Sequence, residues 1–223
     1  MKIPNSKFQI PNKFQIPNSK LDFGELSRAV IGIWSLVIIW SLVIGHWSFP
    51  SYAAKGRHVL MVIAHKDFRD EEYKIPRQIF EREKIIVTVA SSNLEEAQGV
   101  LGIKVKPDIL ISDADIKKYD ALIFVGGPGA VEYYENKNVY QLIKSAYKQR
   151  KVIGAICIAP VILSKADILK GKKATVWYGE AKNLERGGAI YTGKLVERDG
   201  KIITANGPLA SSNFGETIVK LLK

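Results

Sequence analysis

The chain has 223 residues, of which 47% are hydrophobic, enough for one folded domain with a packed core and an additional segment. A single cysteine excludes an intramolecular disulfide framework and leaves the redox compartment open. The net charge of +11 comes from basic residues spread along the chain, with no run longer than three, so we expect no nucleic-acid partner.

The first 27 residues repeat a short unit that begins with Ile-Pro-Asn at residues 3–5, 10–12 and 16–18. A proline in every unit prevents a regular helix and interrupts strand pairing. We therefore expect residues 1–27 to be disordered.

A hydrophobic segment follows at residues 28–50, and it contains the tandem repeat Ile-Trp-Ser-Leu-Val-Ile. No formal charge occurs between Ala29 and Ala54, and the apolar stretch is near the lower length limit for crossing a bilayer. Three interpretations are open: a transmembrane anchor that contacts the membrane through residues 29–49, a signal peptide cleaved near Ala53, or translated repetitive DNA upstream of the true start. The protein is membrane-anchored or exported in the first two cases and cytoplasmic in the third.

From residue 55 onward, apolar segments typical of buried strands alternate with helical patterns. This pattern implies right-handed crossovers and a doubly wound α/β domain over residues 55–223, whose functional residues gather at the carboxyl ends of the strands. A loop is expected at 65–69 and irregular or hairpin structure at 98–107. We expect strands at 57–64, 85–91, 120–125, 152–156 and 173–177, a hairpin at 195–205, and helices at 70–84, 138–149, 159–165 and 211–222.

The only cysteine, Cys157, lies where the strand 152–156 turns into the helix that follows. The unpaired amides at the start of a helix favour an ionised thiol. Such positions lower a thiol pKa from about 8.5 to roughly 3.5–7.5, so the sequence predicts a reactive thiolate. The alternative is a buried structural cysteine that packs like a small hydrophobic residue.

Two other predicted strand ends carry unusual residues. Gly126 and Gly127 follow the strand 120–125, and glycines there let backbone amides approach and stabilise a developing negative charge near the sulfur. A plain tight turn is the alternative. The motif has no Gly-Lys-Ser/Thr, so it is not a phosphate-binding P-loop. Glu72 follows the first strand and is either a group of the site or a solvent-facing acid of the next helix.

Several spaced segments resemble the DJ-1/PfpI superfamily, in the family's order and over residues 57–223. They are residues 72–76, 125–130, 155–160 and 196–208. The resemblance implies a flavodoxin-like three-layer sandwich with a mainly parallel central sheet, in which Cys157 is the nucleophile at a strand-helix elbow and Glu72 is the carboxyl group beside it. It also implies a homo-oligomer. A relationship to class I glutamine amidotransferases is weaker, because the downstream His-x-Glu is absent.

Repulsion between a thiolate and a nearby carboxylate raises the pKa of the carboxyl group until it keeps its proton. A protonated Glu72 can then donate a hydrogen bond to the sulfur of Cys157, and also to an oxidised sulfinate. We expect Gly126, Gly127 and Ile158 to form the oxyanion or substrate-binding surface.

The sequence departs from the family in its histidines. PfpI-type peptidases carry a histidine directly after the cysteine, where this chain has Ile158. The DJ-1 branch carries one near the position of Trp177. His65 and Trp177 are therefore candidate accessory residues. Without a positioned imidazole, proton transfer to a leaving amine is difficult, so peptidase activity is disfavoured.

The leading hypothesis is a cysteine-dependent enzyme of the glyoxalase or deglycase type, or a hydrolase, acting on small α-oxoaldehydes or their protein adducts. The alternative is a non-enzymatic stress protein, in which Cys157 is a redox sensor and the domain has a chaperone-like role. We expect no cofactor and no metal, because the sequence has no cluster of Cys and His ligands.

Overall fold

The structure, a computed structural model, describes residues 56–223. The repetitive segment 1–27 and the hydrophobic segment 28–50 lie outside the described residues. What the sequence predicts for those two segments therefore stays a prediction.

The prediction of a transmembrane protein is wrong for residues 56–223, the part of the chain that the structure describes. Between residues 56 and 223 no helix is both long enough and apolar enough to cross a bilayer. The longest helix there, α2 (Asp70–Arg82), has 13 residues. At about 1.5 Å per residue it spans roughly 20 Å, less than the bilayer's hydrocarbon core of about 30 Å.

Seven strands form the central sheet, in the order β11-β12-β8-β7-β1-β3-β6. All neighbours pair in parallel except β11 and β12, which form an antiparallel hairpin. The strands are β1 (His58–Val62), β3 (Ile86–Ser91), β6 (Ile109–Leu110), β7 (Ala121–Phe124), β8 (Val152–Ile156), β11 (Val196–Asp199) and β12 (Ile202–Ala205).

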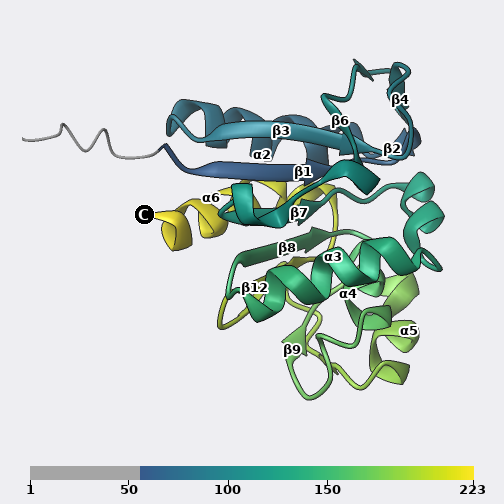
Figure 1. The fold of residues 1–223 in the computed structure, drawn as a ribbon. Helices are drawn as coiled ribbons and strands as arrows, with labels where there is room; N and C mark the ends of the chain where they lie inside the picture. Colours follow the sequence, from purple (N-terminus) through teal and green to yellow (C-terminus); the bar gives the residue numbers. More distant parts are fainter. Residues whose placement is uncertain (1–55) are drawn as a thin grey trace, which may run out of the picture. The chain divides into compact units, whose positions relative to one another are not determined.

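Helices cover both faces of this sheet. In Figure 1, α3 (Lys137–Lys148) and α4 (Pro160–Lys165) lie in front of the strands, whereas α2 and α6 (Ser211–Leu222) lie behind them. A further helix, α5 (Ala181–Arg186), packs beside α4. This arrangement confirms the predicted three-layer sandwich with a mainly parallel sheet.

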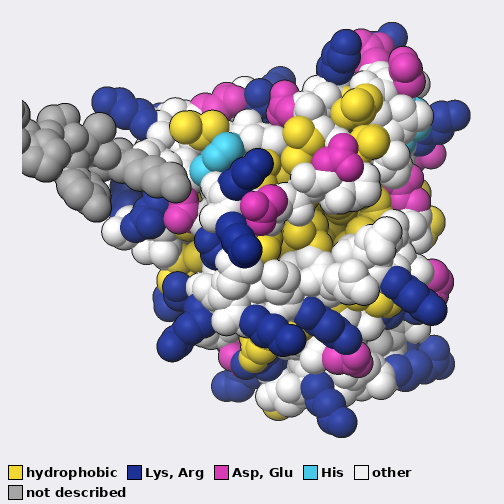
Figure 2. All heavy atoms as spheres, viewed as in Figure 1, with side chains coloured by type: hydrophobic (Ala, Val, Ile, Leu, Met, Phe, Trp, Pro, Cys, Tyr) yellow, Lys and Arg dark blue, Asp and Glu magenta, His cyan; other side chains and the backbone are white. Residues whose placement is uncertain are grey.

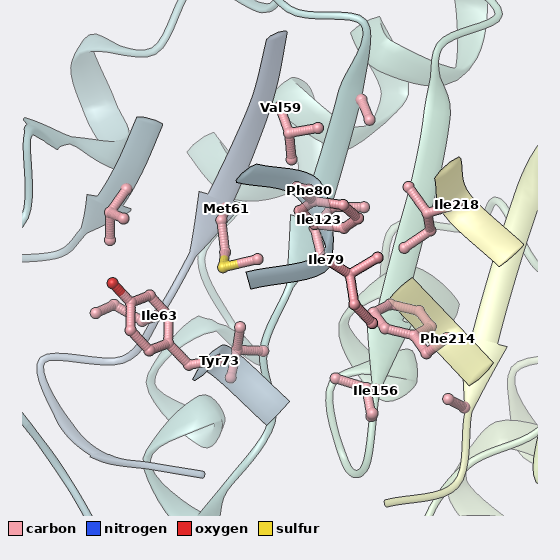
Figure 3. Packing of buried hydrophobic residues seen from close by; sticks show 14 of the residues in the cluster. Val59, Met61, Ile63, Tyr73, Ile79, Phe80, Ile123, Ile156, Phe214 and Ile218 are labelled. Atoms are coloured by element: carbon pink, nitrogen blue, oxygen red, sulfur yellow. The ribbon is translucent and has the colours of Figure 1, made fainter. Parts of the chain in front are cut away.

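Two hydrophobic cores result, one on each face of the sheet. Successive residues of β1 alternate between them: Met61 packs in the core with Phe80 of α2 and Phe214 of α6, whereas Leu60 and Val62 belong to the other core. Figure 3 shows the first core from close by. A strand buried on both faces explains why the sequence of β1 is apolar without alternation.

Local signals fix the helices that border the site. The side-chain oxygen of Asn136 accepts hydrogen bonds from the amides of Asn138 and Val139, which caps the start of α3. Helix α6 approaches α2 closely at Gly215, where an added Cβ would lie 3.1 Å from Pro76 Cα. This close approach packs α2, the helix that carries Glu72, against α6.

The predicted strands and long helices are present within a few residues, and the irregular segment contains an antiparallel pair, β4 (Ala97–Gly99) and β5 (Lys104–Val105). Two short predicted segments differ. The predicted loop 65–69 contains β2 (Lys66–Phe68), which pairs with β4. The predicted strand 173–177 is only β9 (Lys173–Ala174), paired with β10 (Ile190–Tyr191). These elements are two or three residues long, too short for a periodic sequence signal.

Candidate active site

Cys157 follows directly after β8 and has a left-handed backbone conformation, with φ of 63°. That conformation is uncommon for a residue with a side chain and costs about 1–3 kcal/mol. Two hydrogen bonds fix it: the Cys157 amide donates to Ala205 O at 2.9 Å, and Cys157 O accepts from the Trp177 amide at 2.8 Å. Three segments of the chain therefore hold the cysteine at a sharp bend between β8 and α4.

Glu72 lies in the first turn of α2 with no solvent exposure and reaches the same bend. The Gly126 amide donates to Glu72 Oε2 at 3.1 Å. A Cβ on Gly126 would lie 2.5 Å from Cys157 Cβ and 2.7 Å from Glu72 Oε2, so the carboxyl group and the cysteine meet at this glycine. The second oxygen, Oε1, is buried without a nitrogen or oxygen partner in the described chain.

Burial raises the pKa of Glu72 to about 8, and its hydrogen bonds with Cys157 and with the Gly126 amide offset part of that effect. The carboxyl group therefore holds its proton at neutral pH. The direction is the one predicted from the sequence, but the main cause is desolvation rather than repulsion by a thiolate.

The prediction that the pKa of Cys157 is lowered is wrong for the resting protein. Burial, together with the negative charge of ionised Glu72, raises the pKa of this thiol to about 12, although hydrogen bonds from the amides of Gly127 and Ile158 oppose the shift. The side chain is only 9% exposed. Desolvation by the surrounding fold outweighs the favourable amides, so the resting thiol is neutral.

Cys157 opens onto a pocket of about 260 Å³. Most of its wall is apolar and one cation, Arg69, lies at its edge. The lining residues are Arg69, Gly127, Pro128, Cys157, Ile158, Trp177 and Pro208. The pocket therefore suits a small molecule with little charge.

The structure brings most of the predicted site residues together. Glu72, Gly126, Gly127 and Ile158 contact Cys157 or its immediate partners, and Trp177 lines the pocket and donates its amide to Cys157. Gly126 differs from the predicted oxyanion donor, because its amide donates a hydrogen bond to Glu72. The amide of Gly127 is the one that donates to the sulfur.

His65 is not among the residues that line this pocket. Its amide donates to Glu132 Oε1 at 3.3 Å, and its ring Nδ1 is buried without a hydrogen-bond partner among the described residues. The short strand β2 follows it directly. The structure therefore gives His65 no contact that would let it serve as the base for Cys157.

Two residues of the site were not predicted. Arg69 donates from Nε and Nη2 to the two oxygens of Glu71, at 2.8 and 3.0 Å, which fixes its guanidinium beside the pocket. Its position before the first helix, at the carboxyl end of a strand, was the available signal. Tyr134 donates its hydroxyl to Ile158 O at 3.2 Å, a contact between distant segments that no local pattern indicates.

Between residues 56 and 223, no three or more His, Cys, Asp or Glu side chains are grouped so that they could hold a metal ion. The chemistry available at this site is that of a thiol, a protonated carboxyl group, two backbone amides and a guanidinium. These groups can form a covalent bond to an electrophile, move a proton and stabilise an oxyanion.

Comparison with known proteins agrees with this geometry. The DJ-1/PfpI family matches residues 57–221. An uncharacterized protein of Methanocaldococcus jannaschii is 39% identical over 201 residues, which cover 89% of this chain and 98% of that protein. A glutathione-independent glyoxalase of Caenorhabditis elegans is 27% identical and covers 76% of this chain and 91% of its own length.

Among solved structures, the ThiJ/PfpI domain protein of Brachyspira murdochii has a TM-score of 0.74 and 32% identity, and covers 75% of this chain and 97% of that chain. The Methanocaldococcus match covers 89% of this chain, so it extends into the residues before 57. The family match covers the sheet, both helical layers and all the residues around Cys157. The chain belongs to the DJ-1/PfpI family.

Proposed function

We propose that this protein is an enzyme that uses Cys157 on small electrophilic carbonyl compounds, in a glyoxalase- or deglycase-type reaction. The observation that carries the proposal is the buried Glu72 carboxyl group beside a cysteine whose sulfur also receives two backbone amides. The glyoxalase of Caenorhabditis elegans, at 27% identity, supports the same reaction class.

In the first step the sulfur bonds to the aldehyde carbon, and the electron pair of the carbonyl bond moves to oxygen. The thiol proton passes to the ionised fraction of Glu72 and returns from it to the new alkoxide. Hydrogen bonds from the amides of Gly127 and Ile158 lower the energy of the anionic form of the sulfur. A raised carboxyl pKa of about 8 suits a group that must both accept and donate a proton near neutral pH.

With an α-oxoaldehyde, the carbon now bonded to sulfur carries an acidic hydrogen. Glu72 removes that proton, which leaves an enediolate, and returns it to the neighbouring carbon. The hydroxyl proton on the sulfur-bearing carbon moves to the neighbouring oxygen, so the adduct becomes a thioester of a 2-hydroxy acid. Water then hydrolyses the thioester and regenerates the thiol. Every step is a proton transfer, an addition or a hydrolysis, so the reaction needs no redox partner.

Arg69 has a positioning role in this proposal. Its guanidinium is held by Glu71 at the edge of the pocket and stabilises the negative oxygen that develops on the substrate. The pocket of about 260 Å³ favours a small substrate or the end of a modified side chain.

Turnover of methylglyoxal by the full-length chain tests the proposal. Cys157→Ala is expected to abolish activity, and Glu72→Gln is expected to lower it by at least about 100-fold, because general acid-base catalysis contributes that much. Glu216→Gln, an exposed carboxyl group on α6, is the matched control and keeps full activity. Equal rates for the wild type and Cys157→Ala would remove the enzyme hypothesis.

A redox sensor is the second candidate, because the same three donors around the sulfur can hold the oxygens of an oxidised cysteine. The neutral resting thiol slows attack on peroxide, since the thiolate is the reactive form. Mass spectrometry after mild peroxide treatment tests this function, which fails if Cys157 stays reduced. A homo-oligomer stays a prediction from the family resemblance, to be measured by light scattering.

A further inference from the structure

A second cavity, of about 510 Å³, lies at the end of the sheet opposite Cys157. Lys151, which lines it, directly precedes β8, whereas Cys157 directly follows that strand. The six residue steps from Lys151 to Cys157, at about 3.3 Å each, separate the two places by roughly 20 Å. This cavity is therefore distinct from the candidate active site and shares no lining residue with it.

Five cationic side chains and a single carboxylate line this second cavity, which we call the basic cavity. Figure 2 shows Lys and Arg side chains gathered on this side of the molecule, where α3 ends near β12. Asp199, the one acid, is already engaged by Lys172 Nζ at 3.3 Å and by the Lys173 amide at 3.0 Å. The cations are Lys148, Arg150, Lys151, Lys172 and Lys201.

The fold brings these cations together from three separate segments. Lys148 ends α3, Arg150 follows in a left-handed turn with φ of 55°, and Lys201 lies in the turn between β11 and β12. Backbone hydrogen bonds fix them: the Lys151 amide donates to Ala146 O at 3.0 Å within the turn after α3, and the Ile153 amide donates to Lys201 O at 2.9 Å, which joins β8 to the hairpin turn. The cations therefore converge because of the backbone, not because of mobile side chains.

The charge of this cluster is not compensated within the described chain. Lys148, Arg150, Lys151 and Lys201 form no ion pair with any residue between 56 and 223. By contrast Lys144, one turn earlier on α3, pairs with Asp167 at 3.2 Å. A cleft lined by one sign of charge focuses its field and concentrates counter-ions.

An aromatic ring completes the cavity. Tyr147 lies in its wall and is 43% exposed, and Ile202 adds an apolar contact. A cation cluster contacts phosphate groups, and an exposed ring beside it stacks on a planar base. The volume falls within the roughly 300–1,000 Å³ typical of small-molecule sites.

We propose that the basic cavity binds a nucleoside polyphosphate, with the lysines and Arg150 on the phosphates and Tyr147 on the base. The Gly126-Gly127 turn belongs to the candidate active site and does not line the basic cavity. Phosphate contacts supply most of the affinity and make it fall with added salt. The ring supplies the preference for a nucleoside over inorganic phosphates.

Isothermal titration calorimetry of the full-length chain with ATP, and separately with inorganic pyrophosphate, tests the proposal at low and at physiological salt. The double variant Arg150→Glu, Lys201→Glu is expected to weaken both ligands by about tenfold or more. The control Lys182→Glu, Lys220→Glu makes the same change of net charge at exposed positions elsewhere and is expected to leave both affinities unchanged. Tyr147→Ala is expected to weaken ATP only. Circular dichroism verifies that each variant is folded.

Four results would overturn the proposal. Absence of ATP binding at about 1 mM would exclude a site of useful affinity. An equal loss of affinity in the control variant would assign binding to the overall positive charge of the protein. Equal binding of ATP and pyrophosphate, unaffected by Tyr147→Ala, would remove the nucleoside. An oligonucleotide that binds this surface while ATP does not would replace the ligand with a nucleic acid.

Discussion

Replacing Glu72 with glutamine removes a buried carboxyl group whose raised pKa makes the stability of the protein depend on pH near neutrality. The carboxyl group is fully buried and its pKa is raised to about 8 in the native protein. In the unfolded chain the same group ionises near its ordinary value of 4.5. Between these two values the native state holds a proton that the unfolded state has lost, so stability falls as pH rises through this window.

The size of the effect follows from the difference between the two pKa values. Each unit corresponds to about 1.4 kcal/mol, so the shift from 4.5 to about 8 lowers the free energy of unfolding by about 5 kcal/mol across the window. Glutamine is nearly isosteric and does not ionise. The variant is therefore expected to lose this pH dependence and to exceed the wild type in stability at pH 8.

Urea denaturation of the wild type and of Glu72→Gln at several pH values from 5 to about 8 measures this difference. That range stays below 9.0, the ordinary pKa of a thiol, so titration of Cys157 in the unfolded chain does not contribute. Glu216→Gln, on the exposed face of α6, is expected to follow the wild type. Parallel profiles for the wild type and Glu72→Gln would show that Glu72 is not protonated in the native protein.

Three further substitutions test the packing around the site, each by urea denaturation. Gly126→Ala places a methyl group 2.5 Å from Cys157 Cβ, so it is expected to lower the free energy of unfolding by at least about 2 kcal/mol and to abolish turnover; wild-type activity would contradict the geometry. Phe214→Ala empties a fully buried position and is expected to cost about 3–5 kcal/mol, whereas Leu209→Ala, 94% exposed, is expected to change little. The two carboxylate oxygens of Asp70 accept hydrogen bonds from the amides of Leu101 and Ile103, both at 2.8 Å, and Asp70→Asn removes one of these acceptors. The free energy of unfolding is expected to fall by about 1–3 kcal/mol, and an unchanged urea midpoint would refute this prediction.

The buried strands were predictable because a parallel sheet covered on both faces requires continuous apolar runs. β1, β7 and β8 all have that signature, and each was placed within three residues of its observed ends. β2 and β9 carry no such signal, since their pairing depends on distant segments. Arg69 had a local signal, its position at a strand end before the first helix, but only the structure shows that it lines the same pocket as Cys157.

The protonation of the site could not be taken from the sequence. A cysteine at a strand-helix bend predicts a lowered thiol pKa, because local amides favour the anion. The pKa is instead raised, because the fold buries the side chain and desolvates it. Desolvation depends on everything that surrounds a group, and most of those residues are far away in the chain.

The sequence by itself determined the α/β class, the order of the main elements and the position of the cysteine at a strand end, because periodicity and composition are local properties. Only the tertiary structure decided that Glu72 meets Cys157 at Gly126, that His65 does not line their pocket, and that five cations from three segments converge at the other end of β8. Burial and the sum of charges at a point depend on contacts between residues distant in the chain, and a sequence pattern does not contain those contacts.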